Sequence, residues 1–118
     1  NDPCVRISRQ DIDALNNVAS YINDHFNSDL PLDMLARIAC MGTTKLKNSF
    51  KHIYSCTISE YIRQRRMSHA EMLLTSTDLA IEQVALAVGY SNAGRFAANF
   101  KNNTGLFPSE YRKMALRK

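Results

Sequence analysis

Four polar residues between positions 44 and 51 are spaced as if they shared one face of a helix. They are Thr44, Lys47, Asn48 and Lys51, at intervals of three, one and three positions. A lysine can donate hydrogen bonds to O6 and N7 of guanine, and an asparagine can form two hydrogen bonds with adenine. Spacing and chemistry together predict a helix that reads base edges in the major groove of double-stranded DNA.

A second segment, fifty positions later, repeats the apolar framework of the first but not its polar chemistry. Leu46 and Phe50 recur as Phe96 and Phe100, and the tripeptide Ser-Glu-Tyr also occurs twice at this interval. The positions that would face the groove in the second copy are Gly94, Ala97, Ala98 and Lys101. Glycine and alanine offer only close approach or apolar contact with a thymine methyl group. We therefore expect the second helix to contribute fit more than base readout.

Further polar side chains flank both sets and are predicted to contact phosphates or the edges of the site. They are Lys45, Arg95, Asn99, Lys101 and Asn102. The charge distribution agrees with this prediction, because residues 1–42 carry three basic and six acidic residues whereas residues 43–118 carry twelve and five. The net charge thus changes from −3 to +7 where the first predicted recognition helix begins, as expected for a surface that meets a polyanion.

Apolar residues recur at helical spacing along most of the chain, and no segment shows the alternation of a β-strand. This pattern predicts an all-α fold of about seven helices. We interpret residues 1–10 as a linker remnant of a longer protein, 11–56 and 76–118 as two helix-turn-helix units, and 57–75 as a connecting helix. At ~1.5 Å per residue this helix is about 27 Å long, near the ~34 Å of one DNA turn.

Turn and capping residues predict where some helices begin. Asp11 is expected near the start of the first helix, where its charge suits the helix dipole. Gly42 is expected to allow a tight turn, after which Thr43 or Thr44 would cap the next helix. Thr57 and Glu60 have the spacing of a capping box at the start of the connecting helix.

The segment ALAVGYSNAGRFAANFKNNTGLFPSEYR resembles the signature of the AraC/XylS family of transcription regulators, and the resemblance extends from Ile12 to Arg112. It implies two helix-turn-helix motifs joined by a long central helix and bound along one face of DNA. It further implies a bacterial regulator with RNA polymerase as a partner and an N-terminal sensor or dimerisation domain outside this chain. The segment TTKLKNSF is similar to members that respond to siderophores in iron uptake.

Two features of the chain depart from the family pattern. Polar residues are usual in the second recognition helix of the family, where this chain has Gly94, Ala97 and Ala98. A Ser or Thr commonly caps the last helix, and Phe107 stands there instead. Loss of that hydroxyl is expected to weaken the cap by about 1 kcal/mol, partly offset by Pro108 in the first turn.

Cys40, His52 and Cys56 could be read as three metal ligands. Zinc sites usually contain close pairs of ligands, and the chain has neither a CxxC motif nor a convincing fourth ligand. We therefore expect no metal and no cofactor, with Cys40 a small buried residue and Cys56 part of a turn. An odd number of cysteines at irregular spacing favours a reducing cytoplasm, and no apolar run is long enough to cross a membrane.

Other functional classes receive less support. His25, His52 and His69 lack a matching nucleophile and carboxylate, and no glycine-rich phosphate loop follows a strand, so we expect no enzymatic activity. The phenylalanines and tyrosines that could stack on single-stranded bases fall on apolar faces and are expected in the core: Phe50, Tyr61, Phe96, Phe100 and Tyr111.

Two questions stay open at the level of sequence. The Arg63, Arg65 and Arg66 cluster could contact phosphates or a partner, or form a solvated helix face. The alternative function is a helical protein-interaction module that contacts RNA polymerase or the chain's own sensor domain. Such a module would need exposed apolar patches, of which the sequence offers few.

Overall fold

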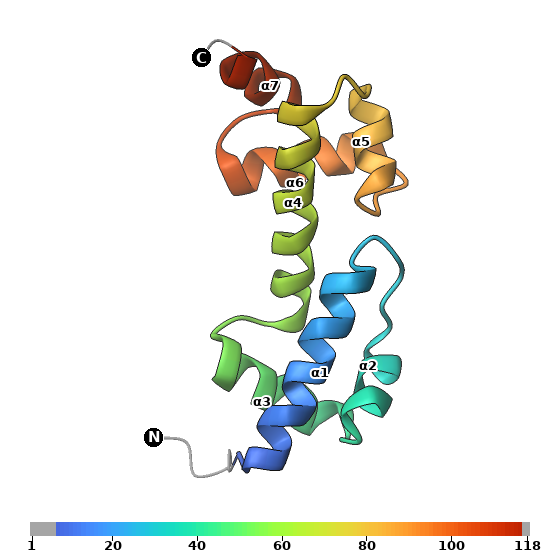
Figure 1. Cartoon of the computed structure of the whole chain (residues 1–118), viewed down its shortest axis with the longest axis vertical. Helices are drawn as coiled ribbons and strands as arrows, with labels where there is room; N and C mark the ends of the chain where they lie inside the picture. Colours follow the sequence, from blue (N-terminus) through green and yellow to red (C-terminus); the bar gives the residue numbers. More distant parts are fainter. Residues whose placement is uncertain (1–6, 117–118) are drawn as a thin grey trace. The chain divides into compact units, whose positions relative to one another are not determined.

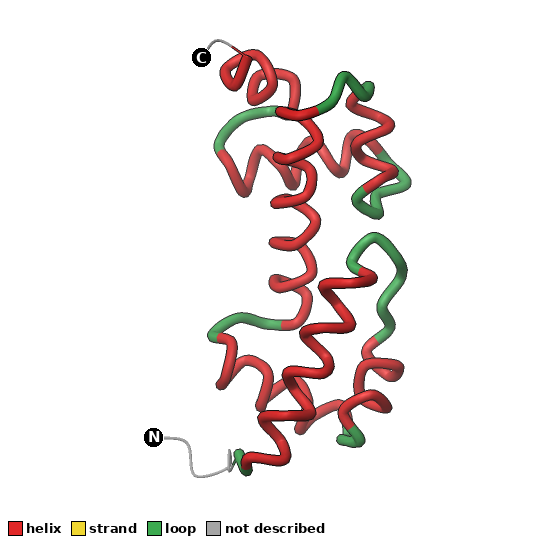
Figure 2. The backbone as a smooth tube through the Cα atoms, viewed as in Figure 1, coloured by secondary structure: helices red, strands yellow, loops and turns green. Residues whose placement is uncertain are grey.

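A computed structural model describes residues 7–116, which form seven α-helices and no β-strand (Figures 1 and 2). The helices are α1 (Arg9–His25), α2 (Leu32–Ala39), α3 (Thr43–Tyr54), α4 (Ile58–Ser76), α5 (Ile81–Ala87), α6 (Ala93–Thr104) and α7 (Pro108–Leu116). The all-α prediction is therefore confirmed. Most of the predicted linker remnant lies outside the described residues.

The chain divides within α4 into two compact units, Asn1–Arg63 (unit 1) and Gln64–Lys118 (unit 2). Each unit has its own apolar core. The fifty-residue repeat of the sequence is also a repeat of helix boundaries, because α6 begins and ends fifty positions after α3, and α7 begins fifty positions after the start of α4.

The core of unit 1 forms where α1, α2 and α3 pack together. Its fully buried residues include Leu15 and Ile22 of α1, Leu35 of α2, and Leu46 and Phe50 of α3. Burying a side chain of this size contributes about 2 kcal/mol, so these five fix how the three helices lie against each other.

The core of unit 2 is built on the buried Phe96 and Phe100 of α6, which pack with Val84 and Val88 at the end of α5. A charged residue, Arg112 of α7, completes this unit. Its guanidinium donates hydrogen bonds to three backbone carbonyls, at distances of 3.0 Å to Leu74, 3.2 Å to Thr77 and 2.7 Å to Leu79. These carbonyls lie at the end of α4 and in the following turn, where a cation is favourable. Sequence reasoning did not assign Arg112 this role.

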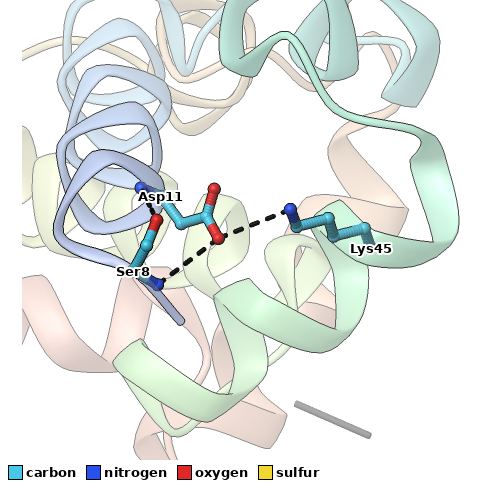
Figure 3. Close-up of polar contacts among 3 residues, drawn as sticks. All are labelled: Ser8, Asp11 and Lys45. Carbon is cyan, nitrogen blue, oxygen red and sulfur yellow. Dashed lines mark hydrogen bonds and ion pairs between the residues drawn. The ribbon is translucent and has the colours of Figure 1, made fainter. Parts of the chain in front are cut away.

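Asp11 lies in the first turn of α1, as expected. The helix begins at Arg9, because Ser8 and Asp11 form a capping box (Figure 3). The Asp11 N–H donates to Ser8 Oγ at 3.1 Å, and the Ser8 N–H donates to Asp11 Oδ2 at 3.4 Å. Asp11 is the third residue of the helix. Its carboxylate therefore lies near the positive end of the helix dipole and also completes the capping box.

The capping box of α4 is confirmed. The Thr57 N–H donates to Glu60 Oε1 at 2.8 Å, and the Glu60 N–H donates to Thr57 Oγ1 at 3.1 Å. The hydrogen bond from the Thr57 backbone holds the pKa of Glu60 below its usual value. At the start of α2, Pro31 is the N-cap residue.

The turn between α2 and α3 was predicted wrongly. Gly42 is the N-cap of α3 with φ −69°, so it needs no special backbone freedom, and neither Thr43 nor Thr44 is the cap. The residue in the left-handed region is Cys40, with φ 55°. The turn of unit 2 has Gly89 in that region, with φ 102°. Unit 1 therefore makes the same kind of turn as unit 2, with Cys40 in the place of a glycine. The prediction assigned this role to Gly42, two positions further along the chain.

The ends of α3 and α6 predict opposite effects of exchanging serine and glycine. Ser55 ends α3 with φ 61°, and Gly105 ends α6 with φ 87°. A Cβ atom on Gly105 would meet no neighbour within 4 Å, so only backbone strain distinguishes the residues there. We expect Ser55→Gly to stabilise the chain by about 1 kcal/mol and Gly105→Ser to destabilise it by about as much. Urea unfolding followed by circular dichroism measures both, and shifts of the same sign would contradict the explanation.

Replacing Arg112 with methionine should loosen unit 2 alone. The change leaves three carbonyls without their charged donor, and we expect a loss of about 2 kcal/mol. Amide hydrogen exchange should accelerate in α5 and α6 but not in α1. Lys113→Met, at the exposed neighbouring position, is the control. Equal acceleration in α1 would show that Arg112 does not act within unit 2.

Candidate nucleic-acid interface

Helix α3 presents a polar face without a carboxylate. Thr44, Lys47, Asn48 and Lys51 are all exposed, as predicted from their spacing. They are held outward because Leu46 and Phe50, on the opposite side, are completely buried. The helix contains no Asp or Glu, so its exposed surface combines positive charge with hydrogen-bond donors. This is the chemistry that base edges and phosphates both accept.

Lys45, predicted to contact phosphate, forms an ion pair within the protein. Its Nζ lies 3.4 Å from Oδ2 of Asp11, the residue that also completes the cap of α1 (Figure 3). The lysine side chain is 55% exposed and the aspartate side chain 18%. No sequence pattern predicts this contact, because Lys45 and Asp11 belong to different helices. Part of the positive charge at the start of α3 is thus balanced internally.

Apart from Arg95, helix α6 exposes only small side chains in its first turns. Gly94, Arg95 and Ala98 are exposed and Ala97 is half-buried. Asn92 caps this helix by accepting the Arg95 N–H at 2.9 Å, and a Cβ atom at position 94 would lie 3.1 Å from that same Asn92 oxygen. Glycine at this position therefore protects the cap, a role that the sequence-based interpretation did not recognise.

The polar residues later in α6 contact other parts of unit 2. The half-buried Asn99 donates from Nδ2 to the Tyr90 hydroxyl at 3.3 Å. Lys101 Nζ lies 4.5 Å from the centroid of the Phe107 ring. Both residues were predicted as flanking contacts, and these interactions hold them in defined positions. Asn102 is exposed.

Phe107 keeps half of a capping box at the start of α7. Its N–H donates to Glu110 Oε1 at 2.9 Å, whereas its side chain has no oxygen to accept a hydrogen bond in return. The ring is 43% exposed and contacts the ammonium group of Lys101. The departure from the family pattern thus exchanges a capping hydrogen bond for a cation–π contact of about 0.5–1 kcal/mol.

The five aromatic residues expected in the core lie in the two cores or pack against them, as predicted. Phe50, Phe96 and Phe100 are completely buried. Tyr61 meets Phe50 edge-on at 5.4 Å between ring centroids, and Tyr111 meets Phe100 in the same way at 5.3 Å. These rings are unavailable as stacking platforms for single-stranded bases.

Cys40 and Cys56 differ in their exposure to solvent. Cys40 is exposed at the C-cap of α2, so its predicted burial is wrong. Burial raises the pKa of the half-buried Cys56 thiol. Within residues 7–116, no three His, Cys, Asp or Glu side chains gather in a way that could hold a metal ion.

The arginine cluster of α4 has two exposed members, Arg63 and Arg65. The guanidinium of Arg66 lies 5.3 Å from the centroid of the Tyr90 ring. Along the described residues as a whole, no helix is both long and apolar enough to span a membrane.

A protein-family model described as a helix-turn-helix domain matches residues 35–114. Among curated relatives, the bifunctional transcriptional activator/DNA repair enzyme AdaA of Bacillus subtilis is 36% identical over 98 residues. That alignment covers 83% of this chain and 46% of AdaA. The chain therefore spans less than half the length of this relative.

Solved structures share the fold. The C-terminal domain of AraT, a response regulator from Geobacillus stearothermophilus, is 29% identical with a TM-score of 0.83, covering 93% of this chain and 88% of that one. The DNA-binding domain of the transcription factor AdpA, solved in complex with a target DNA, has a TM-score of 0.81 at 21% identity. The latter alignment covers 86% of this chain and 91% of the AdpA chain.

Proposed function

Because the chain belongs to the AraC/XylS-type helix-turn-helix family of DNA-binding regulators, we propose that α3 and α6 enter two neighbouring major-groove segments of a duplex operator. The observation that carries this proposal is the exposed, carboxylate-free face of α3, with Thr44, Lys47, Asn48 and Lys51. An α-helix fits the major groove, and these side chains match the hydrogen-bonding groups of guanine, adenine and phosphate.

The two helices have different tasks in this proposal. Helix α3 reads bases directly, and α6 contributes fit through Gly94, Ala97 and Ala98. Arg95 and Lys101 of α6, with Asn99 and Asn102, contact phosphates or the edges of the site. Phosphate contacts of this kind fix position and orientation but carry little sequence information.

The partners of the intact regulator are proposed from its family. We propose an N-terminal sensor or dimerisation domain, contact with RNA polymerase, and action in the bacterial cytoplasm. The iron link suggested by TTKLKNSF is a narrower proposal, tested by whether iron supply changes the regulator's target genes. We propose that this chain has no catalytic activity of its own. Its relative AdaA is described as both a transcriptional activator and a DNA repair enzyme, but this chain spans only 46% of AdaA.

A protein-interaction module is the rival function. Unit 2 does expose large apolar side chains, including Leu86 at 64%, Met114 at 57% and Leu116 at 68%. A salt titration of binding to random-sequence duplex DNA separates the two functions. For DNA binding, log K falls linearly with log salt, with a slope near −0.9 for each phosphate neutralised. A slope near zero would favour the rival.

Selection of binding sites from random duplexes tests the function itself. We expect two specified blocks about one helical turn apart, with stronger base preference in the block under α3. A stronger preference under α6 would contradict the division between reading and fit.

Lys47→Ala and Asn48→Ala should each cost about 1–3 kcal/mol on the selected site and relax the base preference there. Arg95→Ala should instead weaken binding to selected and random duplexes alike, because a phosphate contact is indifferent to sequence. Fluorescence anisotropy with both duplexes measures these losses. If the Lys47 and Asn48 variants lost equal affinity for both duplexes, direct readout by α3 would be excluded.

Asp11→Asn should strengthen binding to random duplex DNA about two- to fivefold at low salt, because it releases Lys45 from its ion pair. Asp13→Asn removes the same charge from an exposed position of the same helix and is the matched control. An equal gain in both variants would assign the effect to net charge and not to Lys45.

A further inference from the structure

Unit 1 contains a groove of about 410 Å³ beside the polar face of α3. Its apolar lining comes from the loop before α2, from α2 itself and from the start of α4, through Leu30, Leu32, Leu35, Ile58 and Ile62. Its polar lining comes mainly from α3, through Lys47, Asn48 and Lys51. A groove of this size, apolar at one side and cationic at the other, has the composition of a small-molecule site.

In unit 2 the matching lysine lies beside an aromatic ring. Lys101 lies fifty positions after Lys51, and Phe107 lies fifty positions after Thr57, which lines the groove. The Phe107 ring lies against the Lys101 ammonium group, with 4.5 Å between Nζ and the ring centroid. In unit 1 the smaller threonine provides no ring, so the place beside Lys51 is open.

We propose that this groove binds a small carboxylate with a flat aromatic body. The ring would lie on the apolar lining and beside Lys51, as the Phe107 ring does beside Lys101 in unit 2. The carboxylate would pair with the Lys47 and Lys51 ammonium groups. Both lysines line the groove, so both ammonium groups lie where a bound carboxylate can reach them.

Occupation of the groove has a consequence for the proposed DNA contacts. Lys47, Asn48 and Lys51 both line the groove and form the proposed reading face of α3. A ligand that holds these side chains withdraws them from DNA, so the carboxylate acts as an antagonist on the DNA-binding domain itself. This consequence rests on the proposed function, whereas the binding site does not.

The site is tested without DNA, by NMR titration of the labelled chain with 2-naphthoate. We expect saturable shifts confined to Leu30, Leu35, Ile58 and Ile62 and to α3. 2-Naphthylmethanol, which has the same ring without the charge, should bind about fivefold more weakly, and acetate, which has the charge without the ring, should cause no saturable shift. Shifts scattered over both units, or equal affinity for the alcohol, would overturn the proposal.

Three variants sharpen the test. Thr57→Phe copies the residue of unit 2 and should abolish naphthoate binding by filling the groove. Lys47→Ala should weaken it about fivefold while leaving the fold intact, because this lysine is exposed. Lys101→Ala, at the matching site of unit 2, should leave it unchanged. If Thr57→Phe proves unfolded, Lys47→Ala against Lys101→Ala decides alone, and equal effects of these two would overturn the proposal.

A second measurement separates the site from its consequence. Fluorescence anisotropy of a random duplex should show the DNA Kd rising in proportion to naphthoate above its own Kd, in the parent chain but not in Thr57→Phe. Binding of naphthoate with an unchanged DNA Kd would overturn the antagonism. A chain that binds naphthoate but no DNA would retain the site and reject the proposed function.

Discussion

Burial of two apolar side chains, one turn apart on each of α3 and α6, decides which other side chains these helices expose to solvent. Leu46 and Phe50 do this in α3, and Phe96 and Phe100 do it in α6, each with no exposed surface. Rotating α3 by one residue would expose a phenylalanine at a cost of about 2 kcal/mol or more. The exposed face of α3 is therefore set by the packing of Leu46 and Phe50 in the core.

The two units share helix boundaries fifty positions apart but differ in how their polar side chains are placed. Three polar side chains of unit 2 contact other parts of that unit: Asn99 donates to the Tyr90 hydroxyl, Lys101 lies beside the Phe107 ring, and Arg112 donates to backbone carbonyls after α4. Unit 1 keeps its lysines and Asn48 on the exposed side of α3. The matching helices α3 and α6 therefore expose different side-chain chemistry.

Apolar periodicity made the helices and most of their inward faces predictable from sequence. Leu46, Phe50, Phe96 and Phe100 are buried as expected, because a helix with one apolar stripe can hide it in only one direction. The Thr57 cap was predictable for a similar reason, since both partners lie within one turn.

Contacts between residues distant in sequence were not predictable. The pairing of Lys45 with Asp11 depends on how α1 and α3 pack, and the three carbonyls held by Arg112 belong to a turn that sequence patterns do not position. The turn at Cys40 was missed for a different reason, because backbone strain at a non-glycine residue leaves no compositional sign. For the candidate site, the sequence indicated which face of α3 is exposed. It did not indicate that Lys45 of this helix is already paired with Asp11.

The hydrogen bonds of Arg112 have a consequence for the order in which the chain can fold during synthesis. The carbonyls of Leu74, Thr77 and Leu79 await a guanidinium that the ribosome adds more than thirty residues later. The core cluster of unit 1 involves no residue beyond Ile62, so it can close while unit 2 is still being made. Vectorial synthesis therefore favours early completion of unit 1 and late closure of unit 2.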